Sequence, residues 1–272
     1  MEKLDFIKMH GLGNDFVIID RRQKNILINE NIIEKISDRK TGAGCDQIIT
    51  IDNPKSDITD ARITIYNSDG DEAEACGNGT RCVAKILSKE MKKSNIILDS
   101  PSGQLLASLN SDGNISVNMG NVRESWSDIP LIKKMDNQNI PIKIDNFSSG
   151  FALNIGNPHI VFFGNNIGEI DLSNIGPGIE NHNFFPKKTN VEFIEIINHK
   201  KIKMRVWERG VGETLACGSG ACAAVYAGFK KEIIEKECEV VFKKGSLKIK
   251  VNSDHVIMTG PAEISYYGNI QI

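Results

Sequence analysis

The chain has 272 residues, 40% of them hydrophobic and 25% charged, which is the balance of a globular protein with one large domain or two ordinary ones. Lys and Arg number 33 against 35 Asp and Glu, so the formal net charge is −2 and no nucleic-acid partner is expected. The longest strongly apolar stretch, 221–229, is well short of the roughly 18 residues that a membrane span needs, and the N-terminal sequence lacks the apolar core of a secretory signal. We therefore expect a cytoplasmic protein with no membrane partner.

The first half of the chain predicts strands around one helix. A short apolar run at 17–20 follows a Gly-Asn turn, and 62–66 alternates polar with apolar residues as a half-buried strand does. The motif Cys-Gly-x-Gly at 76–79 then precedes a segment, 83–91, whose apolar residues follow helical spacing. A strand hairpin is predicted at 104–119.

The second half predicts the same elements in the same order. An apolar run at 160–163 again follows a Gly-Asn turn, and a second alternating strand is expected at 203–207. Another Cys-Gly-x-Gly, at 217–220, leads into helical spacing over 222–229, and a hairpin is predicted at 246–258.

The two halves share sequence as well as pattern. Residues 66–79 read YNSDGDEAEACGNG and residues 207–220 read WERGVGETLACGSG, so that Cys217 stands 141 positions after Cys76. Three further pairs recur at offsets of 140–143: Gly13-Asn14-Asp15 with Gly156-Asn157-Pro158, Gly103-Gln104-Leu105 with Gly245-Ser246-Leu247, and Met119-Gly120 with Thr259-Gly260. Four landmarks at nearly one offset indicate an internal duplication.

The duplication predicts the fold class and the domains. We expect an α+β protein of two pseudo-symmetric lobes, each a strand-rich sheet or barrel around a central helix. The N-terminal lobe comprises residues 1–119 plus 261–272, because the β-forming tail is expected to return to it. The C-terminal lobe comprises residues 120–260.

Six cysteines are too few for a disulfide scaffold in a chain of this length; they stand at positions 45, 76, 82, 217, 222 and 238. Five residues separate Cys76 from Cys82, which is too many for a zinc knuckle, and the four between Cys217 and Cys222 are marginal. No metal is therefore expected. Cys82, Cys222 and Cys238 fit small buried hydrophobic residues.

Cys76 and Cys217 are different, because each precedes Gly-x-Gly and a predicted helix. The first turn of a helix has unpaired N–H groups and a partial positive charge, which make a thiol more acidic and can also hold a carboxylate. Two such thiols in duplicated halves suit the inversion of a carbon centre, in which one group removes a proton from one face and the other returns a proton to the opposite face. No electron-sink cofactor is then required.

Six motifs in order resemble the diaminopimelate epimerase family: KMHGLGNDF (8–16), DQ (46–47), CGNG (76–79), GNPH (156–159), WERGVGET (207–214) and CGSGACAA (217–224). The resemblance implies two lobes around a closing cleft. It also implies interconversion of ll- and meso-diaminopimelate without metal or pyridoxal phosphate, a step in lysine and peptidoglycan precursor synthesis.

The resemblance also implies roles for individual residues. Cys76 and Cys217 would be the catalytic acid/base pair, and Arg209 would bind the distal carboxylate. His159 and Glu208 would tune the acidity of the thiols, and Glu208 would also bind an ammonium group. The implied substrate-binding set is Asn14, Gln47, Asn67, Gly77, Asn78, Asn157, Asn190, Glu208, Arg209, Gly218 and Ser219. Cys45, where the family is expected to carry another residue, would be a passive wall near the cleft.

Three other functions stay open from the residues alone. A racemase acting on proline or hydroxyproline would share the two-thiol chemistry, although Glu208 and Arg209 favour a substrate with a second charged end. A redox protein would cycle the two thiols through a disulfide, and a binding module of the same fold would have no use for either thiol. The expected partner is a small molecule, and the oligomeric state, a homodimer included, stays open.

Overall fold

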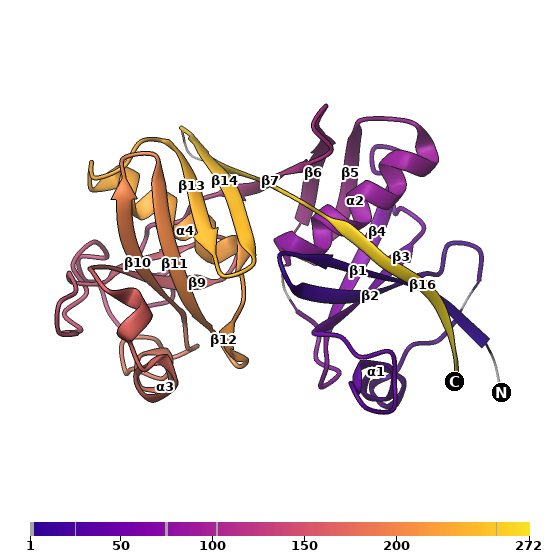
Figure 1. Cartoon of the computed structure of the whole chain (residues 1–272), viewed down its shortest axis with the longest axis horizontal. Helices are drawn as coiled ribbons and strands as arrows, with labels where there is room; N and C mark the ends of the chain where they lie inside the picture. The colour runs from indigo at the N-terminus through magenta and orange to yellow at the C-terminus, as the bar shows by residue number, and fades with distance from the viewer. Residues whose placement is uncertain (1–2, 25, 74–75, 102, 254) are drawn as a thin grey trace. The chain divides into compact units, whose positions relative to one another are not determined.

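A computed structural model describes residues 3–24, 26–73, 76–101, 103–253 and 255–272; residues 74–75 of the first repeat motif lie outside these ranges. The chain folds into two compact units (Figure 1). Unit 1 is Met1–Val117 with Gly260–Ile272, and unit 2 is Asn118–Thr259. Within the described ranges, no helix has the length and apolar character to cross a membrane.

Unit 1 is a mixed sheet wrapped around one helix. Its elements are β1 (Lys3–Gly11), β2 (Asn14–Asp20), α1 (Glu30–Ser37), β3 (Gln47–Asp52), β4 (Ala61–Asn67), α2 (Gly77–Met91), β5 (Asn95–Ser100), β6 (Gly103–Leu109), β7 (Ile115–Asn121, which continues into unit 2) and β16 (Glu263–Gln271). The strands lie in the order β16-β1-β2-β3-β4-β5-β6-β7. Because α2 contacts β1 and β2 as well as β5 and β6, the sheet curves around this helix.

Unit 2 repeats this arrangement. Its elements are β8 (Phe151–Asn154), β9 (Pro158–Phe163), the 3-10 turn η1 (Ile167–Glu169), α3 (Leu172–Glu180), β10 (Asn190–Asn198), β11 (Lys201–Glu208), β12 (Gly212–Thr214), α4 (Gly218–Lys230), β13 (Glu237–Phe242), β14 (Gly245–Asn252) and β15 (His255–Gly260). The strands lie in the order β15-β14-β13-β11-β10-β9-β8, with β12 beside β11. The helix α4 contacts β8 and β9 as well as β13 and β14, so this sheet also surrounds its helix.

The strand pairing shows the duplication directly. In unit 1 the pair β2–β3 is parallel, β3–β4 antiparallel and β4–β5 parallel. In unit 2 the corresponding pairs β9–β10, β10–β11 and β11–β13 have the same three orientations. The protein is therefore α+β, with two pseudo-symmetric lobes, and α2 and α4 occupy equivalent places in them.

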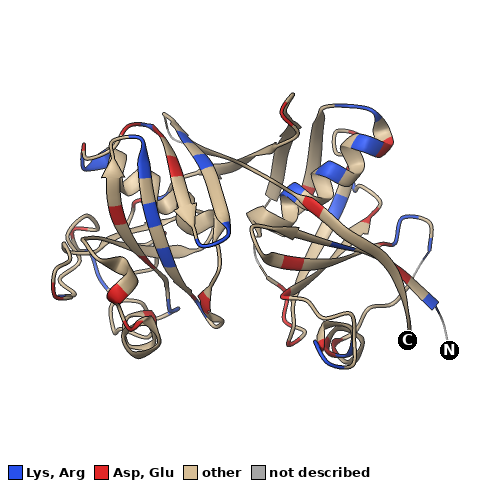
Figure 2. Cartoon of the chain, in the orientation of Figure 1, with Lys and Arg blue, Asp and Glu red and all other residues tan. Residues whose placement is uncertain are grey.

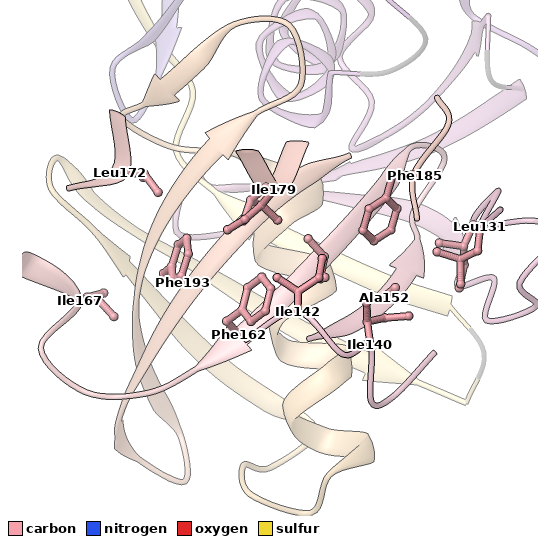
Figure 3. Packing of buried hydrophobic residues seen from close by; sticks show 13 residues of the cluster. Leu131, Ile140, Ile142, Ala152, Phe162, Ile167, Leu172, Ile179, Phe185 and Phe193 are labelled. Carbon is pink, nitrogen blue, oxygen red and sulfur yellow. The ribbon is translucent and has the colours of Figure 1, made fainter. Parts of the chain in front are cut away.

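The core of unit 2 is built on β9 and β10. All six residues of β9 are buried, as in a strand covered on both faces. Phe162 stacks on Phe193 of β10 with ring centroids 5.5 Å apart, and Phe147 meets Phe193 edge-on at 5.1 Å. Phe162 and Phe193 belong to the cluster of 13 buried side chains in Figure 3, and the partly buried Phe147 packs against this cluster. The same rigid strands carry His159 and Asn190 at paired positions.

The surface charges are mixed in each unit. Figure 2 shows Lys and Arg interspersed with Asp and Glu along the strands and helices, in keeping with the net charge of −2. Many of these charges are paired at the surface, as are Lys201 with Glu239 at 2.9 Å and Arg205 with Glu213 at 2.9 Å.

Candidate active site

Cys76 is the N-cap of α2. Its backbone is extended, with φ −147° and ψ 97°, and its Sγ accepts a hydrogen bond from the N–H of Gly79 at 3.4 Å. The thiol is half-buried and lies 3.9 Å from Oδ1 of Asn14. The first turn of α2, which begins with Gly77 and Asn78, carries N–H groups that have no partner inside the helix. A thiol and backbone N–H donors therefore lie together at the start of α2.

Asn14 is held in one orientation toward this thiol. Its Nδ2 donates to Oδ2 of Asp46 at 2.9 Å, and the N–H of Asp15 donates to the same oxygen at 3.0 Å. Its Oδ1 accepts from Nδ2 of Asn78 at 3.2 Å. Because Asp46 holds the donor end of the amide, the carbonyl end of Asn14 faces Cys76 and Asn78.

An ion-pair network fixes the turn that carries Asn14. Asp15 is paired with Lys8 at 2.5 Å and with Arg39 at 2.7 Å, and Lys8 also donates to the carbonyl of Gly44. Burial alone would raise the pKa of Asp15, but hydrogen bonds and charge from Arg39 and Lys8 outweigh it and hold this pKa at about 2. Asp15 is therefore a fixed negative charge at neutral pH.

Gln47 and Asn67 form the other polar edge of the site in unit 1. They are paired residues on the neighbouring strands β3 and β4, and Nε2 of Gln47 donates to Oδ1 of Asn67 at 2.9 Å. Both side chains are half-buried, so each keeps hydrogen-bonding capacity toward solvent. Gln47 directly follows Asp46, which links this pair to Asn14 and Cys76.

Cys217 is the N-cap of α4, the position equivalent to Cys76, but its surroundings are more closed. The residue is only 4% exposed. Burial raises the pKa of the Cys217 thiol well above its usual value, and the nearby carboxylates of Glu208 and Glu192 raise it further. The Ser219 hydroxyl, 3.6 Å from Sγ, and the Gly220 N–H favour the thiolate and partly oppose this rise.

Glu208 is the last residue of β11, and its side chain reaches the start of α4. Its carboxylate accepts a hydrogen bond from the Thr214 hydroxyl and meets the Cys217 thiol. Burial raises the pKa of Glu208 above its usual value, and its hydrogen bonds to Thr214 and Cys217 oppose that rise. A carboxylate in contact with the thiol can both tune its acidity and receive an ammonium group.

His159 is fully buried between two side chains. Its Nδ1 lies 2.7 Å from Oε1 of Glu192 on β10, and its Nε2 lies 2.8 Å from Oδ1 of Asn157. Asn157 itself is half-buried and so reaches the surface of the site. The imidazole thus contacts the predicted binding residue Asn157 on one side and a carboxylate that the sequence did not single out on the other.

The turn that carries Arg209 is anchored by two buried side chains. Oδ1 of Asn190 accepts from the Arg209 N–H at 2.9 Å, while its Nδ2 donates to the carbonyl of Pro158 at 2.8 Å. Glu180 of α3 accepts from the Trp207 indole at 2.7 Å and from the Gly210 N–H at 2.9 Å. Asn190 is engaged with backbone at both ends of its amide, and its role toward substrate remains a prediction.

The other four cysteines are buried. Cys82, Cys222 and Cys238 are buried, as predicted. Cys45 is also buried, in the hydrophobic core beside α1, with its Sγ 3.5 Å from the Ser37 hydroxyl. Among the described residues no group of three or more His, Cys, Asp and Glu is placed to hold a metal ion.

The structure brings the predicted residues together within each unit. Unit 1 joins Asn14, Cys76, Gly77 and Asn78 at the start of α2 and pairs Gln47 with Asn67 on β3 and β4. Unit 2 joins Asn157, His159, Asn190, Glu208, Arg209, Cys217, Gly218 and Ser219 around the start of α4. Sequence reasoning missed Asp46, Glu180 and Glu192, although Asp46 lies inside a motif that it used.

Solved structures of similar fold are distant in sequence. A phenazine biosynthesis protein of the PhzF family from Bacillus anthracis is 16% identical with a TM-score of 0.72, and the match covers 100% of both chains. A hydroxyproline epimerase from Agrobacterium vitis is 9% identical with a TM-score of 0.71, over 99% of this chain and 91% of that one. At these identities the likeness shows the two-lobed fold alone.

Other relatives are much more similar to this chain in sequence than these solved structures are. The diaminopimelate epimerase of Pelagibacter ubique is 44% identical over 271 residues, which covers 97% of each chain. The diaminopimelate epimerase of Zymomonas mobilis is 39% identical and covers 97% of this chain and 96% of its own. The profile of the family "Diaminopimelate epimerase" matches residues 6–124 and 151–265, and so takes in both cysteine N-caps. The chain belongs to the diaminopimelate epimerase family.

Proposed function

We propose that the protein interconverts ll- and meso-diaminopimelate with Cys76 and Cys217 as a two-base pair. The observation that carries this proposal is the equivalent placement of the two thiols, each the N-cap of the central helix in one of two duplicated lobes. Relatives named diaminopimelate epimerase, at about 40% identity over nearly the whole chain, support the choice of substrate.

The reaction follows from the chemistry of the two helix starts. A thiolate removes the proton from one α-carbon, leaving a carbanion whose charge spreads onto the adjacent carboxylate. The other cysteine, as a thiol, delivers its proton to the opposite face, so one S–H bond forms as the other breaks and the configuration is inverted. The roles of the two sulfur atoms are then exchanged, and the pair titrates as a coupled unit.

The backbone donors that follow each cysteine suit the charged intermediate. Gly77, Asn78, Gly218 and Ser219 occupy the first turns of α2 and α4, where N–H groups have no partner inside the helix. N–H groups fixed around the reacting carboxylate stabilise the negative charge as it develops, without any electron-sink cofactor.

The remaining residues suit the two amino-acid ends of the substrate. A guanidinium such as that of Arg209 binds a carboxylate through two parallel hydrogen bonds, and the carboxylate of Glu208 suits an ammonium group. We assign hydrogen bonding to the substrate to the side chains of Asn14, Gln47, Asn67, Asn157 and Asn190. We also place the enzyme in the cytoplasm, where its free cysteines stay reduced.

Proton NMR in deuterated water tests the proposal. Reduced protein is incubated with ll-diaminopimelate and no added cofactor, and with proline as a control substrate. We expect the α-proton signal of diaminopimelate to be lost as the meso isomer appears, and proline to stay unchanged. Exchange of proline alone, or of neither compound by folded and reduced protein, would refute the proposed substrate.

A further inference from the structure

Glu192 is a buried carboxylate in an otherwise apolar part of β10. Its neighbours Val191, Phe193 and Ile194 are buried hydrophobic residues, and Glu192 itself is 0% exposed. Its Oε1 meets Nδ1 of His159 at 2.7 Å, whereas its Oε2 has no hydrogen-bond partner within the part of the chain that the structure describes. Burying a carboxylate with one unpaired oxygen costs free energy. This cost is reduced when the carboxylate shares a proton with a neighbour or is bound by a strong hydrogen-bond partner.

The hydrogen bonds define where that proton lies. Oδ1 of Asn157 can only accept, so Nε2 of His159 carries a hydrogen and donates to it. The contact between Nδ1 and Oε1 of Glu192 then needs one more hydrogen, on the imidazole or on the carboxyl group. His159 and Glu192 therefore hold this proton in common, and when it lies on the imidazole the negative charge lies on the Glu192 carboxylate.

The pair lies beside the start of α4. A Cβ added at Gly220 would stand 2.8 Å from Oε1 of Glu192 and 2.7 Å from Cε of Met204, so the glycine makes room for the carboxylate against this helix. The titratable groups that face Cys217 and this pair are His159 from β9, Glu192 from β10 and Glu208 from β11. The charge of Glu192 raises the pKa of the Cys217 thiol, after burial and the charge of Glu208.

We propose that Glu192 is a positioning residue for the epimerisation, which shares one proton with His159 and thereby holds Cys217 as the proton-bearing thiol of the free enzyme. Its part in turnover rests on the proposed function, whereas the shared proton and its effect on Cys217 do not. Glu192 is sealed from the substrate by burial, so it acts only through His159 and Cys217.

The first test uses the unaltered protein. The ¹⁵N chemical shifts of labelled histidine are measured, and the variant His159→Gln assigns the signals of His159. We expect the chemical shift of Nδ1 to lie between the values of a protonated and an unprotonated ring nitrogen. In Glu192→Gln, whose amide can donate to Nδ1 without sharing its hydrogen, this signal should move to the unprotonated position. A wild-type Nδ1 signal already at the position seen in the variant would overturn the shared proton.

The second test measures Cys217 directly. Alkylation by iodoacetamide is followed at each cysteine by mass spectrometry across a pH series. We expect Glu192→Gln to lower the pH midpoint of Cys217 alkylation by about one unit and to leave the midpoint of Cys76 alkylation unchanged. At a pH below both midpoints, Cys217 of the variant should then react about tenfold faster than Cys217 of the wild type. Glu195→Gln, at a half-buried position of the same strand, is the matched control and should leave both midpoints in place.

Kinetics separates this inference from the proposed function. With diaminopimelate as substrate, we expect Glu192→Gln to lower kcat about tenfold with KM changed less than about twofold, because the altered group influences proton transfer and not binding. An unshifted Cys217 midpoint in a folded variant would overturn the inference even if the enzyme is an epimerase. If the Cys217 midpoint shifts in the variant but the protein is inactive on diaminopimelate, the shared proton of His159 and Glu192 is supported and only the proposed substrate is rejected.

Discussion

Cys76 and Cys217 take the same backbone position but meet different side chains. Cys76 is half-buried and faces the amide of Asn14, whereas Cys217 is almost fully buried and meets the carboxylate of Glu208. An amide carbonyl and a carboxylate both accept from a thiol, but only the carboxylate also repels the thiolate. The duplicated helix starts therefore place the two thiols in different electrostatic surroundings.

Removal of either thiol tests this directly. Cys76→Ala and Cys217→Ala should each lower epimerase turnover by at least about 10²-fold, because each removes one of the two proton-transfer groups, while the fold is retained. The controls are Cys82→Ala on α2 and Cys222→Ala on α4, buried cysteines one or two turns further along the same helices. Turnover and circular dichroism are measured together, and a Cys76 or Cys217 variant with near-normal turnover would contradict the two-base assignment.

Asp15 should contribute stability that depends on pH. Its pKa of about 2 lies below the ordinary value of 3.8, so its contribution is complete above about pH 4 and is lost as the pH falls through about 2. Asp15→Asn should therefore lower the free energy of unfolding by about 1–2 kcal/mol near pH 7, and the difference should shrink below pH 3.

Urea unfolding at several pH values measures this effect. Asp20→Asn is the control, since Asp20 pairs with Arg22 at the surface and such pairs contribute at most about 1 kcal/mol. A difference between wild type and Asp15→Asn that is the same at pH 7 and at pH 2 would show that lost packing, and not charge, is responsible.

The sequence could indicate the two cysteines but not all of the residues around them. Cys76 and Cys217 were identifiable because the repeat placed both before glycine and a helix. The roles of Asp46 and Glu192 were not, since a carboxylate in a loop or a strand is ordinarily assigned to the solvent face. Their roles depend on contacts with Asn14, 32 positions away in the chain, and with His159, 33 positions away.

At the scale of elements, α3 supports the turn that carries Arg209. Its last residue, Glu180, holds the Trp207 indole and the Gly210 N–H, and its Gly176 lies directly against the Trp207 ring. A Cβ at Gly176 would stand 2.5–2.7 Å from three atoms of that ring. The close packing of α3 on Trp207 therefore fixes the start of the turn.

Two glycines of α3 allow a matched test of this packing. Gly176→Ala should destabilise the protein by about 1–3 kcal/mol through overpacking and should raise KM, because Trp207 must move and the Arg209 turn with it. Gly178→Ala, which meets nothing within 4 Å, should stabilise it by about 0.5–1 kcal/mol through helix propensity. Thermal unfolding and steady-state kinetics check both variants, and equal effects of the two would contradict the packing argument.

The elements that the sequence predicted are those with strong local signals. The strands at 17–20, 62–66, 160–163 and 203–207 lie within β2, β4, β9 and β11, and α2 and α4 begin within the two glycine motifs. The helix α3 was missed because it contains two glycines and Pro177, which ordinarily argue against a helix. The parallel pairing of β2 with β3 and of β9 with β10 depends on long-range packing that no local pattern specifies.

At the scale of the whole molecule, the proposed reaction requires both thiols to reach one carbon atom. If they do, mild oxidation in the absence of substrate should join Cys76 to Cys217 in a disulfide and abolish activity, and a reducing agent should restore it. Mass spectrometry of the linked peptides checks the pairing, and Cys45→Ala should behave as wild type. Inactivation without a Cys76–Cys217 peptide would count against a shared site.

The return of β16 to unit 1 has a consequence for synthesis on the ribosome. Unit 2 is one continuous segment, whereas unit 1 needs residues 263–271 to pair along β1. The nascent chain can therefore complete its second lobe while the first still has an open strand edge, the kind of surface at which chains aggregate. The lobe that is translated first is finished last, and a ribosome that stops short of β16 releases a chain with one finished lobe and one exposed edge.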